Sequence, residues 1–252
     1  MVAQVSALGN NALIVFPRSS RMSGARDSSQ GSRLTEADAK ALVKESTSIA
    51  NAAPFLRASS QIVHESENAT ASVIGTRLDY FAIRNWKVEK GEAWSREAES
   101  VGAKVVVIGK ETARVLFGSD DPVGKSVRIG RFYFQVIGVL EEKGQSPFGQ
   151  NQDEIAVMPI GTMRATMVRA RQGEVQAIMM SATSAETTSS AQRQAEGILR
   201  ERHRITEGQD DDFQVRSQAE FQALQDSIFG MLTLLLIGVD PSGPFKADHY
   251  RY

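Results

Sequence analysis

The pattern in this chain that comes closest to known chemistry is Gly118–Ser126, which reads GSDDPVGKS. A phosphate-binding loop has a similar spacing of glycines before Lys-Ser, follows a strand and leads into a long helix. Here the glycines are one residue too far apart, and the preceding segment is expected to be a helix. Asp120 and Asp121 also place negative charge where backbone N–H groups would hold phosphate. We therefore interpret this segment as a turn and predict that the chain binds no nucleotide or other cofactor.

The other residues capable of catalysis are few. The chain has 3 histidines and no cysteine, so disulfides, thiolate metal sites and cysteine nucleophiles are excluded. We interpret His64, beside Glu65, as a solvated side chain at a strand end, and His203 as part of the basic last turn of a helix. The acidic run Asp210–Asp212 is typical of a solvated loop. These patterns predict no catalytic residue and no metal site, so we do not expect an enzyme.

Length and charge set further limits. A chain of 252 residues can bury a core as one large domain or two small ones. The formal net charge of −1 gives no general attraction to nucleic acid or to an anionic membrane surface. We therefore expect no nucleic-acid partner.

The stretch Val105–Leu140 predicts the elements that surround the Gly118 turn. Val105–Ile108 is a short β-branched run typical of a buried strand. Glu111–Phe117 has one apolar face and predicts a short helix, for which Gly118 is a suitable cap. Ser126–Ile129 and Phe132–Val139 alternate apolar and polar residues around Gly130-Arg131, which predicts a hairpin.

Similar patterns predict the rest of the framework. Thr35 is a suitable N-cap, with Asp38 as its capping-box partner, for a helix that ends near Asn51 before Pro54. A second hairpin is expected from Leu56–Glu65 and Ala69–Thr76, with a turn at Glu67-Asn68. A long helix is expected over Ala185–His203. Further strands are predicted at Ala12–Phe16, Glu154–Pro159, Val175–Ser181 and Phe213–Val215.

Two segments are candidates for contacts with other molecules. The aromatic cluster in Leu78–Trp86 could stack a ligand, but we favour a role in a core or at a subdomain junction. The polar loop Glu141–Gln152 carries one large apolar residue, Phe148, which is either pinned to the body or offered to a partner. The candidate partner-contact loop is Gln145, Ser146, Pro147, Phe148, Gly149 and Gln150.

The last part of the chain differs in character. Ile228–Val239 has no charged residue and is too short to span a bilayer. It is either a buried core helix or the start of a truncated transmembrane helix. Asp240–Tyr252 shares no periodicity with it and is interpreted as an appended tail.

Several segments, taken in order, resemble the large extracytoplasmic domain of ABC-transporter permeases of the MacB/FtsX type. Each is weak alone, but the ordered set is specific and covers roughly Leu8 to Leu224. The matching segments are Leu8–Val15, Leu34–Asp38, Val106–Gly109, Leu116–Gly118, Asp121–Lys125, Phe134–Leu140, Phe148–Glu154, Val157–Pro159, Leu199–His203 and Asp212-Phe213.

The resemblance implies an α+β fold of two subdomains. A porter-like α/β layer would be built from both chain ends, residues 1–82 and 174–227. A mainly-β subdomain of the type called Sabre would be inserted at residues 83–173. Residues 228–239 would start the second transmembrane helix, and residues 240–252 would be the tail.

The resemblance also implies a function. The domain would lie on the periplasmic or extracellular side of the bacterial inner membrane, between flanking transmembrane helices. The permease would act as a homodimer or with a paired permease, driven by a cytoplasmic ABC ATPase, and could meet a periplasmic adaptor and an outer-membrane channel. The domain would transmit motion for export of macrolides, peptides or toxins and would perform no catalysis itself. The alternatives are a lipoprotein-release permease domain on the same scaffold and a soluble enzyme of unknown class.

Overall fold

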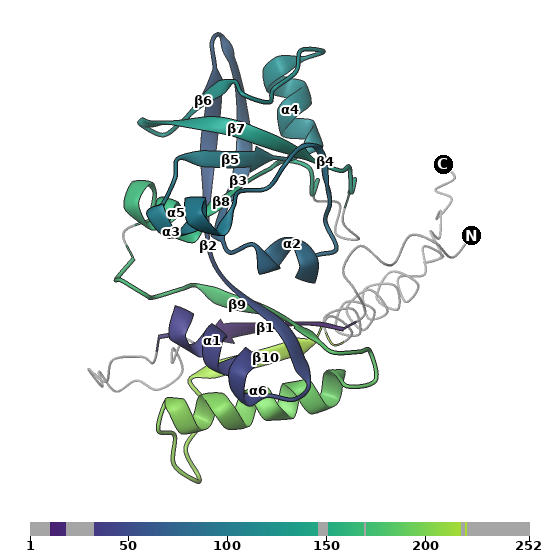
Figure 1. The fold of residues 1–252 in the computed structure, drawn as a ribbon. Helices are drawn as coiled ribbons and strands as arrows, with labels where there is room; N and C mark the ends of the chain where they lie inside the picture. The colour runs from purple at the N-terminus through teal and green to yellow at the C-terminus, as the bar shows by residue number, and fades with distance from the viewer. Residues whose placement is uncertain (1–10, 19–32, 146–150, 169, 218–219, 221–252) are drawn as a thin grey trace, which may run out of the picture.

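Strand β2 (Ile49–His64) is 16 residues long and belongs to two sheets, as Figure 1 shows. Its first part, through Phe55, pairs with β9 (Ala177–Ala182), and its second part, from Leu56, pairs with β3 (Glu67–Thr76). The computed structural model describes residues 11–18, 33–145, 151–168, 170–217 and 220. Within this part of the chain, β2 divides the fold into a lower and an upper subdomain.

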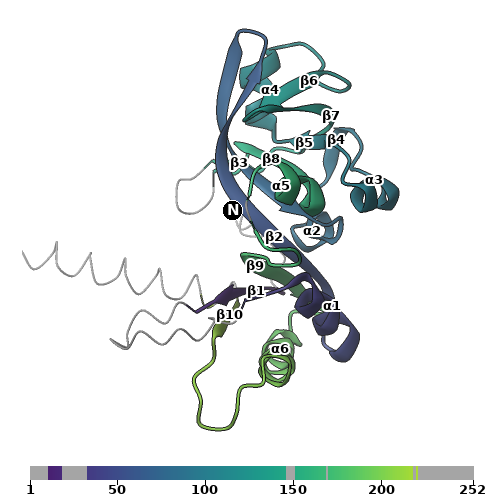
Figure 2. The same ribbon diagram turned by 90° about the vertical axis from the view of Figure 1, so that its left-hand side faces the viewer.

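The lower subdomain is built from both ends of the described chain. Its elements follow a β-α-β-β-α-β order, and its antiparallel sheet has the strand order β10-β1-β9-β2. Both helices contact each other below this sheet (Figure 2). Besides β2 and β9, the elements are β1 (Ala12–Pro17), α1 (Glu36–Glu45), α6 (Thr188–Arg202) and β10 (Phe213–Ser217).

The upper subdomain is inserted between β2 and β9 and is mainly β. Its strand pairs close on themselves in the order β2-β3-β8-β5-β7-β6 and back to β2, with β4 added beside β7. Closure leaves few unpaired strand edges. The elements are β4 (Val88–Gly91), β5 (Val105–Ile108), β6 (Ser126–Ile129), β7 (Phe132–Leu140), β8 (Ile155–Pro159), α2 (Asp79–Ile83), α3 (Arg96–Val101), α4 (Lys110–Phe117) and α5 (Ile160–Thr166). The α+β fold with an inserted mainly-β subdomain agrees with the expectation from the sequence.

The hydrophobic core is continuous between the subdomains. One cluster of buried residues extends from Leu13 and Phe213 in the lower sheet to Val73 and Phe134 in the upper one. A second cluster packs α2 and two tryptophans against Ala53 of β2 and Met179 of β9. Tyr80 and Trp86 are each 2% exposed within it. The prediction that the Leu78–Trp86 aromatic cluster fills a core or a subdomain junction is therefore confirmed.

The first helix ends earlier than the sequence predicts. α1 stops at Glu45, and the strand begins at Ile49, so the expected helix end near Asn51 is wrong. The side-chain oxygen of Gln194 on α6 accepts hydrogen bonds from Ser46 Oγ and from the N–H groups of Thr47 and Ser48. Ser46 Oγ in turn accepts hydrogen bonds from the N–H groups of Ser48 and Ile49, so a local turn at Ser46, held by Gln194 from a distant helix, ends α1.

The hairpin turn and the short elements of the upper subdomain also differ from expectation. β2 and β3 are joined by Glu65-Ser66, with Glu65 at φ 50°, and not by the predicted Glu67-Asn68. β4 and α3 lie in a segment that the sequence indicated only as charged and rich in turns. The predicted β5 strand, α4 helix with Gly118 at φ +59°, and β6–β7 hairpin are confirmed.

The ends of the chain were expected to hold membrane and tail segments. Residues 228–239 and 240–252 lie outside the described residues. None of the helices in the described ranges is long and apolar enough to cross a membrane. The subdomain limits at residues 83 and 173 stay a prediction; the change of partner along β2 comes earlier, between Phe55 and Leu56.

Gly75 of β3 gives a test of how closely the upper subdomain is packed. A Cβ at this position would lie 2.3 Å from the Cβ of Met163 on α5, which is fully buried. Gly75→Ala should therefore lower the free energy of unfolding by roughly 1–3 kcal/mol in urea titrations. Gly161→Ala is the matched control, because Gly161 lies on α5, the same helix as Met163, and nothing lies within 4 Å of the Cβ that the substitution adds. The free energy of unfolding of the control should rise by up to about 1 kcal/mol, because alanine has a higher helix propensity than glycine. Equal effects of the two substitutions would contradict this packing.

Candidate functional site

The two described ends of the chain lie next to each other on the lower sheet. β1 and β10 are antiparallel neighbours, and Leu13 near the start of β1 pairs with Ser217 at the end of β10. The N–H of Ser217 donates to Glu220 Oε2 at 3.1 Å, and the N–H of Glu220 donates to Ser217 Oγ at 3.2 Å. This reciprocal pair is typical of the first turn of a helix. The chain therefore enters and leaves the domain at one place.

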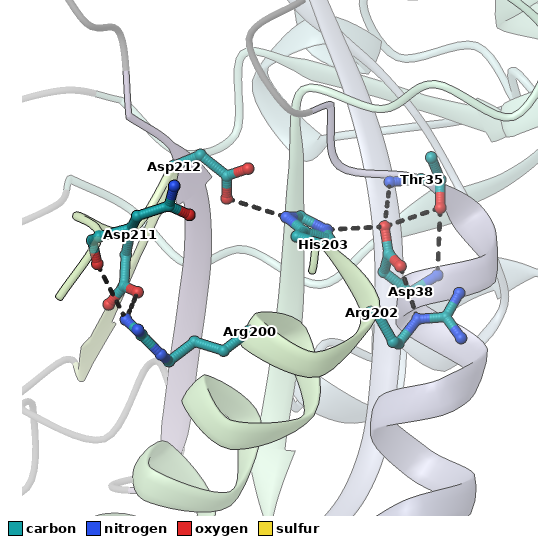
Figure 3. A network of polar contacts seen from close by, with 8 residues as sticks. Thr35, Asp38, Arg200, Arg202, His203, Asp211 and Asp212 are labelled. Atoms are coloured by element: carbon teal, nitrogen blue, oxygen red, sulfur yellow. Dashed lines mark hydrogen bonds and ion pairs between the residues drawn. The ribbon is translucent and has the colours of Figure 1, made fainter. Parts of the chain in front are cut away.

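A buried polar network joins α1 to the end of α6 (Figure 3). At its centre, Asp38 is 4% exposed. Its Oδ2 accepts hydrogen bonds from Thr35 N at 2.9 Å and from Thr35 Oγ1 at 2.7 Å, while Thr35 Oγ1 accepts from Asp38 N. The predicted capping box is confirmed. The same carboxylate accepts from Nε of Arg202 on α6 at 2.7 Å, so one side chain caps α1 and ties it to α6.

His203 lies between two carboxylates. Its Nδ1 is 2.9 Å from Asp212 Oδ1, and its Nε2 is 3.5 Å from Asp38 Oδ2. Figure 3 shows the ring in line between them. The hydrogen bond to Asp38 raises the pKa of His203 above 6.5; burial opposes this shift, and Asp212 adds to it. For Asp38, burial raises the pKa, but hydrogen bonds from His203, Arg202 and Thr35 outweigh it and leave the pKa well below its usual range.

The loop that leads into β10 is fixed by the same end of α6. Arg200 forms an ion pair with Asp211 and donates to the carbonyl oxygen of Thr206 at 3.1 Å. The acidic run Asp210–Asp212, expected to be a solvated loop, is thus only partly solvated: Asp211 and Asp212 pair with α6, and Asp210 is exposed. The network positions the strand through which the chain leaves.

The junction between the subdomains contains a second charged cluster. Glu36, in the first turn of α1, contacts Arg77 at 2.5 Å through Oε2 and Arg164 at 2.8 Å through Oε1. Arg77 follows β3 and Arg164 is on α5, so both arginines belong to the upper subdomain. Burial raises the pKa of Glu36, but hydrogen bonds from both arginines outweigh it and hold the pKa below 4.5.

The base of the candidate partner-contact loop is rigidly held. Asp153, 3% exposed, accepts hydrogen bonds from the N–H groups of Lys143 at 2.9 Å and Gly144 at 2.7 Å. Trp86 Nε1 donates to the carbonyl oxygen of Glu141 at 2.8 Å. Lys143 Nζ lies 5.3 Å from the ring centre of Trp86, and burial together with nearby Arg84 lowers the pKa of Lys143 to about 8.

A groove of about 430 Å³ lies between this loop base and α4. Its walls combine polar and apolar surface and carry both signs of charge. They include Lys90, Lys110, Glu111, Arg114, Glu142 and Gln145. Two of its cations already have partners, because Lys110 pairs with Glu89 and Arg114 with Glu111. Such a surface fits a polar protein contact better than a lipid chain.

The structure places the predicted site residues as follows. Gln145 forms an isolated β-bridge with Asn151 at the base of the loop. Ser146, Pro147, Phe148, Gly149 and Gln150 lie outside the described residues. His64 Nδ1 is 2.9 Å from the carbonyl oxygen of Ser126. His203 lies between the carboxylates of Asp38 and Asp212.

Sequence reasoning missed Glu36, Arg77, Arg164 and Asp153 as functional candidates. Glu36, Arg77 and Arg164 act through partners far away in the chain, so no local spacing reveals these pairs. Asp153 instead contacts the backbone of Lys143 and Gly144 across one loop. The only local signal is the capping box itself, which places Glu36 in the first turn of α1 beside Asp38.

Comparison with known proteins gives a consistent picture. A family model described as MacB-like periplasmic core domain matches residues 1–198. The macrolide export ATP-binding/permease protein MacB of Syntrophobacter fumaroxidans is 29% identical over 289 aligned positions, which cover 93% of this chain and 40% of that protein. The protein of the same name from Rhodospirillum rubrum is 32% identical over 238 positions, covering 94% of this chain and 35% of that protein. The chain therefore spans two fifths or less of the length of these relatives.

Two solved structures share the fold. The periplasmic region of MacB from Actinobacillus actinomycetemcomitans has a TM-score of 0.69 and 19% identity, covering 89% of this chain and 97% of that one. The extracellular domain of the noncanonic ABC-type transporter YknZ from Gram-positive bacteria has a TM-score of 0.65 and 20% identity, covering 82% and 100%. This chain therefore shares its two-subdomain fold with both solved structures.

Asp38→Asn tests the network between α1 and α6. The substitution keeps the shape of the side chain but leaves Arg202 and His203 without their shared anion. The free energy of unfolding should fall by about 3 kcal/mol, as when one partner of a mostly buried ion pair is removed. Asp210→Asn is the control, because Asp210 is exposed in the nearby loop; it should change stability by less than about 0.5 kcal/mol. Similar losses in both variants would argue against the network.

His203 also predicts a pH dependence of stability. A pKa raised above 6.5 in the folded state means that the folded protein binds a proton more tightly than the unfolded chain. The stabilisation by His203 should be full below pH 6.5 and be lost as the pH rises through the raised value. In urea titrations, the stability difference between the natural chain and His203→Gln should shrink across that range. A difference that grows with pH would have the wrong sign for this network.

Proposed function

The chain belongs to the family of MacB-like periplasmic core domains, and from this premise we propose that it relays motion driven by a cytoplasmic ATPase. It is the periplasmic domain of a MacB-type ABC transporter permease. The relay would turn ATP-driven movement of transmembrane helices into a conformational change on the far side of the membrane and so support export.

The observation that carries this proposal is the pairing of Leu13 with Ser217. A domain placed between two adjacent transmembrane helices must receive both chain ends at one place. Leu8 and Leu224, which the sequence predicted to lie close together, are outside the described residues. The nearest described positions, on neighbouring strands β1 and β10, satisfy the requirement.

The proposed route by which movement passes through the domain follows from the strand pairing and the packing. β1 and β10 pair in the sheet that includes β9 and the first part of β2. β2 then continues into the closed ring of the upper subdomain without a break. Because the core is continuous across the junction, a displacement of the chain ends would move the upper subdomain with it.

We further propose that the loop between Gly144 and Asn151 contacts a partner. The two ends of this loop are held on the upper subdomain by the Asp153 carboxylate and by the Gln145–Asn151 bridge. A loop whose two ends are held loses less conformational entropy when it binds, and this favours contact with a partner. The groove beside it would form part of the same contact.

The partners proposed for the intact protein come from the family. They are a second permease copy or a paired permease, a cytoplasmic ABC ATPase, a periplasmic adaptor and an outer-membrane channel. Relatives are named for macrolide export. We therefore propose macrolide-type efflux, with the location on the outer side of the bacterial inner membrane.

We propose that the domain itself is not catalytic. In the described chain, His203 and His64 contact carboxylates and a carbonyl oxygen, which supports structural roles for both. The two alternatives drawn from the sequence gain no specific support: lipoprotein handling predicts a groove lined with apolar side chains, and seven of the fifteen residues that line the groove beside the loop are charged.

Removal of the domain from the intact transporter tests the relay. Because the chain ends leave from paired strands, a short Gly/Ser linker can replace residues 12–217 without pulling the membrane helices apart. We expect ATP hydrolysis by the purified transporter to continue while export of a macrolide falls to the level of cells that lack the transporter. A Gly161→Ala transporter, in which the added Cβ has nothing within 4 Å and the relay stays intact, is the control. Normal export without the domain would contradict the proposal.

Asp153→Asn tests the contact loop. Loss of the charge weakens the hold on Lys143 and Gly144 and frees the loop base. Affinity for the purified adaptor, measured by calorimetry, should fall about tenfold, which corresponds to ~1.4 kcal/mol. Asp210→Asn, in the lower subdomain, should bind as the natural chain does. An unchanged affinity of Asp153→Asn for the adaptor would show that this loop is not part of the contact.

A further inference from the structure

The first turn of α1 is held from both subdomains at once. Glu36 and Asp38 are two residues apart, so their side chains leave the helix about 200° apart. Asp38 points to α6, where it contacts Arg202 and His203. Glu36 points to the upper subdomain, where it contacts Arg77 and Arg164. α1 is thus a bridge between the upper subdomain and the helix that leads into β10.

The contacts of Glu36 have the geometry of a fork. Each carboxylate oxygen contacts a different arginine, and the two arginines come from different elements of the upper subdomain. The three side chains are between 16% and 27% exposed, so water weakens these contacts only in part. A tilt that moves either Arg77 or Arg164 away from Glu36 would lengthen one of the two contacts.

The chain segment that returns from the upper subdomain is fixed at the same place. The N–H of Glu36 donates to the carbonyl oxygen of Gly173 at 2.8 Å, and the N–H of Val175 donates to that of Leu34 at 2.9 Å. Arg164 also donates to the carbonyl oxygen of Glu174 at 3.2 Å. Glu36 therefore lies where the second of the two chain crossings between the subdomains meets α1.

Stability alone does not explain this arrangement. Within the described chain, Nε of Arg77 and Nε of Arg164 are buried without a hydrogen-bond partner. A buried N–H without a partner is costly, and ion pairs removed from water contribute little net stability. What such pairs can supply is a unique geometry, because only one relative orientation of the two subdomains satisfies both contacts.

We propose that Glu36 is a positioning residue that sets the angle between the two subdomains. Asp38 in the same turn of α1 contacts α6, so the orientation that Glu36 sets also fixes α6 and β10, the strand at which the chain leaves the domain. This inference rests on the proposed relay function and names the residue that keeps the relay from bending at its junction.

The test uses distances between spin labels, measured by double electron–electron resonance on the whole chain. The chain has no cysteine, so two can be introduced without removing any. Val101→Cys on α3, where the side chain is 76% exposed, marks the upper subdomain. Arg193→Cys, at an exposed position of α6, marks the lower one. Narrow distributions report a fixed angle, and broad or split ones report a free junction.

Glu36→Gln in this labelled chain should broaden or split the distribution and shift its mean by several ångström. Glu89→Gln is the matched control: it also breaks an ion pair of 2.5 Å, with Lys110, but both partners lie in the upper subdomain. The control should keep the distribution of the natural chain. If Glu36→Gln also keeps that distribution, Glu36 does not set the angle and the inference is overturned.

Arg164→Met removes the fork from the other side and guards against a folding defect in Glu36→Gln. Thermal melts of each variant separate loss of positioning from loss of fold. A broad distribution in a variant that still melts cooperatively supports the inference. Melting temperatures that fall in both variants while the distribution stays narrow would assign a merely structural role and overturn it. Because removal of the whole domain tests the relay independently, a failure here would leave that proposal standing.

Discussion

The fold depends on a single strand shared by two sheets. Once β2 pairs with β9 over its first part and with β3 over its second, the two subdomains cannot move far apart without breaking strand pairs. The buried side chains of β2 alternate into a core that both subdomains share. This constraint is the physical basis of the proposed relay from the edge that holds β1 and β10 to the opposite end of the molecule (Figure 1).

The buried charges of this domain lie at joints between elements. Asp38 joins α1 to α6, Glu36 joins α1 to the upper subdomain, and Asp153 fixes the base of the Gly144–Asn151 loop. Asp38 and Glu36 each receive donors from two separate segments, and Asp153 receives the adjacent N–H groups of Lys143 and Gly144. Such charges fix relative orientation more than they add stability, which is what a mechanical relay requires and what a catalytic site would not need in this form.

The sequence predicts the elements whose causes are local. The Thr35–Asp38 capping box, the Gly118 cap and the β6–β7 hairpin follow from nearby residues, and the structure confirms them. The end of α1 was mispredicted in part because Gln194, far along the chain, holds the Ser46 turn that ends the helix. The pairs of Glu36 with Arg77 and Arg164 were invisible for the same reason. The family and the two-subdomain plan could be predicted because the ordered set of segments is specific.

The most direct test of the central claim is a pair of distances in the intact transporter with and without ATP. One joins labels at positions 101 and 193 within a single domain, and the other joins position 101 in the two copies of the permease. A relay that moves as one body predicts that the first distance stays fixed while the second changes with ATP. A change in the first distance with a constant second one would contradict it, because the movement would then end at the junction between the subdomains.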